Sequence, residues 1–145
     1  MVDSSRVRVV AICVFRHDDR LLVIEGFDKV KRSFYHRPLG GGVEFGETSQ
    51  EAVQREIREE TGQEITDLRL LGVLENLFVC DGKPGHEIVF VYDGRFVDEA
   101  MYGKESMTLT EDGGETFRVT WRPLASFDDQ HRLVPEQLWD LLGGR

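Results

Sequence analysis

Residues 41–63 read GGVEFGETSQEAVQREIREETGQ, and this stretch decides how the rest of the chain is interpreted. Thr48, followed three residues later by Glu51, fits a capping box, which predicts the start of a helix. Gly62 fits the left-handed position that commonly ends a helix. The apolar stripe between these ends consists of Ala52, Val53 and Ile57. The sequence therefore predicts one amphipathic helix that follows a glycine-rich turn.

Three glutamates, Glu56, Glu59 and Glu60, lie on one side of this predicted helix. Because a helix turns by about 100° per residue, they cover only about 100° of its circumference. Carboxylates held so close repel one another. At the edge of an apolar stripe, partial removal of each carboxylate from water also costs roughly several kcal/mol unless the group is paired or bound to a metal. Hard divalent cations take oxygen ligands. The spacing therefore favours a metal site over a solvated acidic helix face.

The same stretch resembles the Nudix box, whose pattern is G-x5-E-x7-R-E-U-x-E-E-x-G-U, where U is a bulky apolar residue. Gln63 stands where an aliphatic residue is usual, and we expect Ile65 to supply that apolar contact. Beyond the box, the resemblance rests on a compatible length and strand pattern. The matching positions are Gly41, Glu47, Arg55, Glu56, Ile57, Glu59, Glu60 and Gly62.

The resemblance implies a set of roles for these residues. Arg55 would orient a neighbouring glutamate through a charge-assisted hydrogen bond, and Glu56 or Glu59 would activate water. Glu47 would either order the site around the metal or contact a further ion. The implied cofactor is Mg²⁺ or Mn²⁺. The implied metal-binding residues are Gly41, through its backbone carbonyl, together with Glu47, Glu56, Glu59 and Glu60.

Residues outside the box add candidates for substrate binding and proton transfer. Arg37 is the basic residue nearest the glycine-rich turn, and we expect it to bind a substrate phosphate. Carboxylates bound to a metal accept protons poorly, so a separate general base is expected from the acidic segment between residues 105 and 115. Glu115 is favoured because Gly113 and Gly114 precede it and a strand follows it. The other candidates in the segment are Glu105 and Glu111.

Several further residues have less specific interpretations. His86 and Glu87, which open a strand after a turn, are interpreted as a polar pair at the strand end, with a place in the pocket lining as the alternative. Phe78 and Trp121 are interpreted as core residues. Cys13 and Cys80 are interpreted as buried free thiols, because a zinc site that combined them with His36 and His86 would lack close ligand spacing.

The pattern of apolar residues predicts an α/β fold in one domain, residues 1–145. Strands on both sides of the central helix, with a helix near the end of the chain, indicate a mixed sheet between helices. The resemblance sharpens this to the Nudix α/β/α sandwich. Residues 98–114 are expected to form a loop or a frayed edge of the sheet, and Pro135 to begin the closing helix. The predicted strands are residues 7–15, 21–27, 68–80 with a break at 75–76, 87–97 and 117–121.

Composition limits the possible partners and location. A formal net charge of −9 and a pI near 4.9 disfavour tight binding to nucleic acid, which needs clustered Lys and Arg. The sequence contains no apolar run of membrane-spanning length. The first residues lack the apolar block of a signal peptide, so a cytoplasmic protein is expected. A small-molecule nucleotide is the expected partner, and a homodimer is left open.

The predicted function is divalent-metal-dependent hydrolysis of a diphosphate linkage in a nucleoside diphosphate derivative, such as a nucleotide sugar or an ADP-ribose-like compound. The alternative substrate is a nucleoside triphosphate, cleaved to a monophosphate and pyrophosphate. A domain that senses a nucleotide without cleaving it is a third interpretation. It is disfavoured because every glutamate of the box is present.

Overall fold

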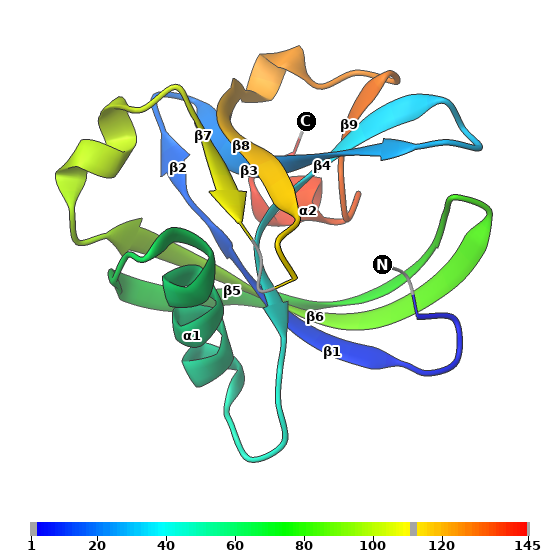
Figure 1. The fold of residues 1–145 in the computed structure, drawn as a ribbon, viewed down its shortest axis with the longest axis horizontal. Helices are drawn as coiled ribbons and strands as arrows, with labels where there is room; N and C mark the ends of the chain where they lie inside the picture. The colour runs from blue at the N-terminus through cyan, green and yellow to red at the C-terminus, as the bar shows by residue number, and fades with distance from the viewer. Residues whose placement is uncertain (1–2, 111–112, 145) are drawn as a thin grey trace.

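A computed structural model describes residues 3–110 and 113–144. In it, a strongly curved sheet carries helix α1 on one face and helix α2 on the other (Figure 1). Among the described residues, no helix has the length and apolarity needed to cross a bilayer. The strands are β1 (Arg8–Val14), β2 (Arg16–His17), β3 (Arg20–Asp28), β4 (Ser33–Gly42), β5 (Ile65–Cys80), β6 (Lys83–Phe96), β7 (Ser106–Thr110), β8 (Thr116–Pro123) and β9 (His131–Leu133). The helices are α1 (Ser49–Thr61), α2 (Leu138–Leu141) and the 3-10 turns η1 (Glu99–Gly103) and η2 (Leu124–Ser126).

The sheet is mixed, which confirms the predicted fold class. Its strand order is β5-β6-β1-β4-β3-β8-β7, with β2 paired to β3 and β9 paired to β4. Strand β1 lies between β6, to which it is parallel, and β4, to which it is antiparallel. The first half of β4 pairs with β3, whereas its last four residues, 39–42, pair with β1. This change of partner brings the glycines of β4 to the middle of the curved sheet.

Gly40 makes the close contact between β4 and β1 possible. A Cβ atom at this position would lie 2.1 Å from the Ala11 carbonyl oxygen, and the backbone φ of +148° is one that other residues rarely adopt. Only glycine therefore allows the two strands to meet at this point, immediately before Gly41.

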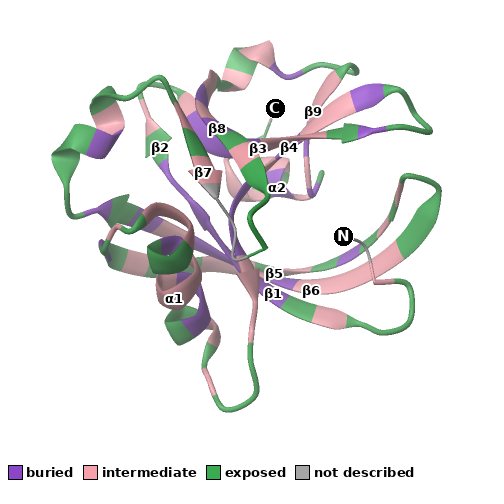
Figure 2. Ribbon diagram, in the orientation of Figure 1, coloured by how far each residue is buried: buried purple, intermediate pink, exposed green. Residues whose placement is uncertain are grey.

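Helix α1 begins and ends as the sequence predicts. Thr48 and Glu51 form both hydrogen bonds of the capping box, and Gly62 has a left-handed φ of 72°. The predicted apolar stripe is completely buried against the sheet, where it contacts a cluster that includes Cys13 (Figure 2). Since the stripe fixes the rotation of α1, it also fixes the direction in which the glutamates of the helix point.

A second core lies on the opposite face of the sheet. Val10, Ile12 and Val89 pack there against Leu133 and Leu138, so that the end of the chain covers this face. The closing helix is shorter than the sequence indicated. Strand β9, which the sequence did not predict, precedes it and pairs with β4.

One expectation about a strand was wrong, and the loop alternative for another segment does not hold. The expected break at residues 75–76 is absent, because Glu75 and Asn76 stay paired with β6. Register shifts occur instead near the start of β5, between Thr66 and Arg69 and between Leu70 and Gly72. Residues 98–114, expected to form a loop or a frayed edge, contain η1 and the edge strand β7, since β7 gains a hydrogen-bonding partner in β8 that its own sequence does not reveal.

Candidate functional site

Arg55 occupies the centre of the acidic cluster. Its Nε and Nη2 atoms donate to the two carboxylate oxygens of Glu47 at 3.1 and 2.7 Å. Its Nη1 atom donates to Glu56 at 3.0 Å and to Glu59 at 3.2 Å. The Gly42 carbonyl accepts a further hydrogen bond of 2.9 Å. One planar guanidinium therefore joins the turn before α1, the helix itself and the end of β4.

The electrostatic environment of each glutamate follows from this arrangement. Hydrogen bonding to Arg55 is the main cause that lowers the pKa of Glu47. Burial is the main cause that raises the pKa of Glu56, and it outweighs the opposing effect of Arg55. The glutamates in turn raise the pKa of Arg55. The Glu47 and Glu56 side chains are 16% and 20% exposed and Glu59 is 49% exposed, so Glu59 reaches furthest towards solvent.

The glycines of β4 lie directly against the glutamates of α1. The Gly40 amide donates to a Glu60 carboxylate oxygen at 3.1 Å. A Cβ atom at Gly41 would lie 2.5 Å from the Glu56 carboxyl carbon and from one of its oxygens. Because Gly41 has no side chain, the Glu56 carboxylate can occupy the space that a larger residue at position 41 would need.

The oxygen atoms gathered here are ligands of the kind that a hard divalent cation prefers. They comprise carboxylate oxygens from Glu56, Glu59 and Glu60 and a backbone carbonyl from Gly41, all of which line one cleft. Within residues 3–110 and 113–144, no three His, Cys, Asp or Glu side chains are gathered closely enough to enclose a metal ion. Glu56 and Glu59 are instead bound to Arg55.

Replacing Gly41 with alanine should displace the Glu56 carboxylate, because the new methyl group would occupy the space that the carboxylate now fills. We expect turnover to fall by about 10²-fold, the effect of a displacement of about 1 Å in an active site. Steady-state kinetics of Gly41→Ala would measure this. Gly103→Ala is the matched control, since nothing lies within 4 Å of its added Cβ. Equal rates for both variants would contradict the placement of Glu56.

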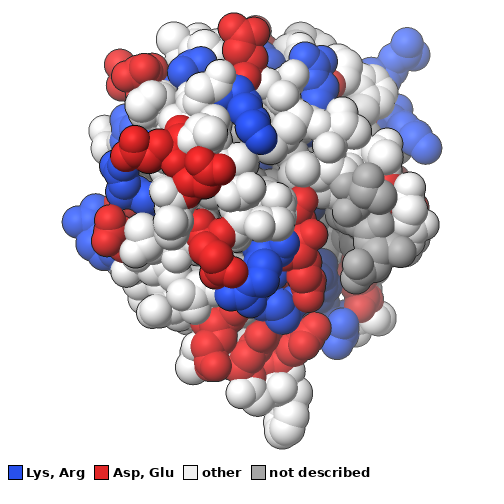
Figure 3. Space-filling model, turned by 60° about the vertical axis from the view of Figure 1, so that its left-hand side comes forward, with Lys and Arg blue, Asp and Glu red and all other residues white. Residues whose placement is uncertain are grey.

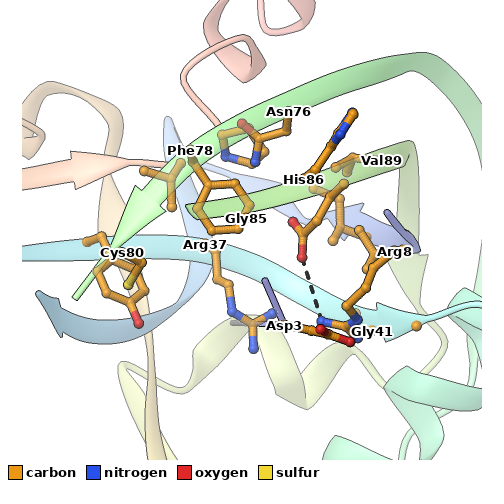
Figure 4. Close-up of a pocket in the computed structure, with 18 of the residues that line it drawn as sticks. Asp3, Arg8, Arg37, Gly41, Asn76, Phe78, Cys80, Gly85, His86 and Val89 are labelled. Carbon is orange, nitrogen blue, oxygen red and sulfur yellow. Dashed lines mark ion pairs between the residues drawn. The ribbon is translucent and has the colours of Figure 1, made fainter. Parts of the chain in front are cut away.

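The cleft beside these residues has a volume of about 940 Å³. Arg37 lines it, four residues before Gly41 on the same strand. In the view of Figure 4, Arg8 and Arg37 extend towards the edge where Gly41 lies, and Asn76 and Phe78 lie at the opposite edge. Arg8 forms an ion pair of 3.6 Å with Glu87, whereas the side chain of Arg37 has no ion pair or hydrogen bond within the described part of the chain.

Acidic side chains outnumber basic ones in the lining. On the face drawn in Figure 3, acidic and basic side chains crowd together in the lower half of the molecule. A polyphosphate would meet repulsion in such a cleft unless cations offset the field. The described basic side chains that line the cleft are Arg8, Lys31, Arg37 and Arg132. The described acidic ones are Asp3, Asp28, Glu56, Glu59, Glu60, Glu87 and Glu136.

Hydrogen bonds between two turns close the far end of the cleft. The Lys29 amide donates to Asp81 at 2.7 Å, and the Asp81 amide donates to Asp28 at 3.3 Å. The Lys31 ammonium reaches the Val79 carbonyl at 2.6 Å. The β3–β4 turn is therefore joined to the β5–β6 turn, which limits the cleft at the end away from Gly41.

Two of the three candidate bases in the acidic segment before β8, Glu105 and Glu115, lie apart from the cluster. Glu105 and Glu115 are exposed and do not line the cleft, although Gly113 does. Glu111 lies outside the described residues. Among the described residues of this segment, Gly113 lines the cleft, whereas neither Glu105 nor Glu115 is placed beside the glutamates of α1.

Several residues differ from the sequence-based interpretation. Phe78 and Cys80 are not core residues, because both line the cleft on the side of β5 away from α1. Trp121 is buried, as expected. Arg8 and Asn76 were not predicted, since only the pairing of β5, β6 and β1 shows that they face the same cleft. The polar pair His86 and Glu87 also lines it.

Comparisons with known proteins identify the family. The NUDIX domain model matches residues 5–142. The chain is 34% identical over 149 residues to a protein of Mycobacterium tuberculosis (strain CDC 1551 / Oshkosh) named "Putative mutator protein MutT4", covering 97% of this chain and 52% of that protein. It is 36% identical over 105 residues to "Uncharacterized Nudix hydrolase YvcI" of Bacillus subtilis (strain 168), covering 66% of this chain and 61% of that protein. The chain belongs to the Nudix family of hydrolases.

Solved structures share the fold. A MutT NUDIX hydrolase from Burkholderia pseudomallei superimposes with a TM-score of 0.65 at 22% identity, covering 95% of this chain and 98% of that one. A structure described as an ADP compounds hydrolase gives a TM-score of 0.52 at 24% identity, covering 82% of this chain and 58% of that one. The chain spans about half to three-fifths of the length of the curated relatives it matches.

Proposed function

We propose that this chain is a divalent-metal-dependent pyrophosphohydrolase that cleaves the diphosphate linkage of a nucleoside diphosphate derivative, of the nucleotide-sugar or ADP-ribose type. The observation that carries the proposal is the acidic cluster around Arg55, which meets the glycines of β4 at one end of a cleft. Arg37 stands in that cleft with its guanidinium unpaired within the described residues.

Each residue of the cluster has a separate task in this proposal. Glu56, Glu59 and Glu60, with the Gly41 carbonyl, hold Mg²⁺ or Mn²⁺. Glu47 keeps Arg55 in place, and Arg55 holds Glu56 and Glu59 in position until the metal binds. When bound, the ions would neutralise charge on the phosphate oxygens. Arg37 binds and orients a substrate phosphate through its planar fork of donors. A carboxylate takes the proton from the water that attacks phosphorus.

The shape of the cleft favours a substrate with a group on each side of the diphosphate. Along β4 the lining runs from Tyr35 to Gly41, a distance of roughly 20 Å at about 3.3 Å per residue. The volume of about 940 Å³ lies near the upper end of the range for small-molecule sites. A nucleoside triphosphate is the second candidate. The relative named as a mutator protein, whose alignment covers 97% of this chain, supports this candidate.

A screen with Mg²⁺ over nucleotide sugars, ADP-ribose and nucleoside triphosphates tests the proposed function. Phosphate release after phosphatase treatment reports cleavage of the first two, and pyrophosphate release reports cleavage of the third. The proposal expects the diphosphate derivatives to give the highest kcat/KM. Faster turnover of the triphosphates would favour the second candidate. No turnover of any compound would contradict both.

We expect the general base to come from the acidic segment before β8, with Glu115 favoured. Gly113, two residues earlier, lines the cleft, so a modest movement of the segment would bring the Glu115 side chain closer. In separate Glu105→Gln, Glu111→Gln and Glu115→Gln variants, loss of the base should lower kcat by about 10²- to 10⁴-fold and flatten the acidic limb of the pH–rate profile. Metal affinity should remain unchanged. Near-normal rates in all three variants would assign the base to the box, with Glu56 as the first candidate.

A further inference from the structure

Asn76 is a mostly buried polar residue whose side chain forms no hydrogen bond with the part of the chain that the structure describes. It lies on β5, where only 9% of its surface is exposed, and it lines the cleft. Its backbone pairs with Glu87, but nothing among residues 3–110 and 113–144 hydrogen-bonds to its carboxamide. The Asn76 residue is mostly buried, but its carboxamide atoms are not among the fully buried polar atoms without a partner, so the amide is open to the cleft and available to hydrogen-bond a water molecule or a ligand there.

An aromatic ring lies beside this amide. Phe78 is two residues further along β5 and therefore points to the same face of the sheet. Its ring lies across Gly85 on β6, where a Cβ atom would be 2.4 Å from the ring. Because Gly85 has no side chain, the ring rests on the sheet and stays beside the cleft that both residues line (Figure 4). The cleft thus combines a flat apolar surface with an adjacent hydrogen-bonding group.

The register of the sheet sets the distance from this position to the proposed phosphate site. Asn76 pairs with Glu87, which pairs with Arg8, so the three residues form a row across β5, β6 and β1. Two strand spacings separate Asn76 from Arg8, roughly 10 Å. Arg8 also lies beside the glycines of β4, because its guanidinium is 3.3 Å from a Cβ built on Gly42. This separation leaves room for a ribose between a phosphate beside the glycines of β4 and a planar group near Asn76.

We propose that Asn76 determines which nucleobase the cleft accepts, with Phe78 as the surface on which the base stacks. This inference rests on the proposed function for the orientation of the nucleotide. A carboxamide offers one donor and one acceptor side by side, so it matches a base edge that presents the complementary pair. Stacking on Phe78 tolerates every base, whereas the amide distinguishes among them.

Binding measurements test this inference without relying on hydrolysis. The probes are the α,β-methylene analogues of ADP, GDP, CDP and UDP, with methylenediphosphonate as the base-free ligand, titrated calorimetrically in Mg²⁺. Wild-type affinity should differ by about 10-fold or more between the best and worst bases. Asn76→Leu should lower the affinity for the best-bound analogue by about 10-fold and reduce the difference in affinity among the four analogues. The affinity for methylenediphosphonate should stay the same. Phe78→Leu should weaken all four nucleotides by similar factors.

Two controls separate recognition from folding. Gln130→Leu makes the same amide-to-leucine change on an exposed turn and should alter no affinity. Asn76→Ser, which keeps a small polar group, replaces Asn76→Leu if the latter fails to fold by circular dichroism. The inference is overturned if the wild type binds all bases equally, or if loss of Asn76 leaves the base preference intact. An equal loss for methylenediphosphonate also overturns it. Base-dependent binding without any hydrolysis would instead contradict the proposed function alone.

Discussion

Glu59→Gln and Glu60→Gln should each lower kcat by roughly 10² or more, the scale of losing one charge-stabilising group. The substitution keeps the size and shape of the side chain but removes its charge. Glutamine at position 60 can still accept the hydrogen bond from the Gly40 amide, so the contact between α1 and β4 should survive. Steady-state kinetics at saturating Mg²⁺ would measure the loss.

Glu64→Gln is the matched control for both variants. Glu64 is exposed, pairs with Arg58 beyond the end of α1 and does not line the cleft, so the same loss of charge there should leave kcat unchanged. Wild-type turnover in Glu59→Gln or Glu60→Gln would remove that residue from the proposed metal ligands. Unfolding of either variant, followed by circular dichroism, would assign its carboxylate a structural role.

Arg55→Met should lower kcat by at least about 10²-fold, because the glutamates would lose their shared partner and their orientation. Arg55 donates hydrogen bonds to Glu47, Glu56, Glu59 and the Gly42 carbonyl. Without it, partly buried carboxylates would repel one another. Since these groups retain some exposure to solvent, we expect the free energy of unfolding to fall by only about 1–3 kcal/mol. Kinetics and urea denaturation would measure the two effects.

Arg55→Lys separates charge from geometry. A lysine keeps the positive charge but cannot form the planar fork that holds Glu47 through both of its oxygens. Partial recovery of stability with little recovery of kcat is the expected result. If Arg55→Met retains the wild-type kcat, Arg55 serves only as a surface ion pair and does not position the site.

The local features of the fold could be predicted from the sequence. The ends of α1 and its buried stripe follow from side chains within a few residues of one another, so the capping box and Gly62 are visible as a pattern. The mixed sheet followed from the order of strand and helix patterns. In contrast, β7 and β9 depend on pairing with distant strands, which a local pattern does not contain.

The candidate site likewise combines residues that the sequence pattern predicts with residues that only the fold brings together. The box residues form one continuous motif, and the structure places Arg55 among its glutamates. The end of the cleft that is proposed to hold the nucleobase is different, because Asn76 and Phe78 lie on β5, far in sequence from Arg8 on β1. Asn76 looked like a strand break because a polar residue interrupts an apolar run. The pairing of β5 with β6 shows that it faces a cleft while the strand continues.

The dependence of turnover on a divalent cation tests the central claim most directly. Protein freed of metal with a chelator and dialysed should hydrolyse its best substrate from the screen at less than about one hundredth of the full rate. Adding Mg²⁺ or Mn²⁺ should restore that rate. Glu59→Gln, assayed in parallel, should need a higher Mg²⁺ concentration for half of its own maximal rate, whereas Glu64→Gln should match the wild type. Full turnover by the wild type in excess chelator would contradict the account.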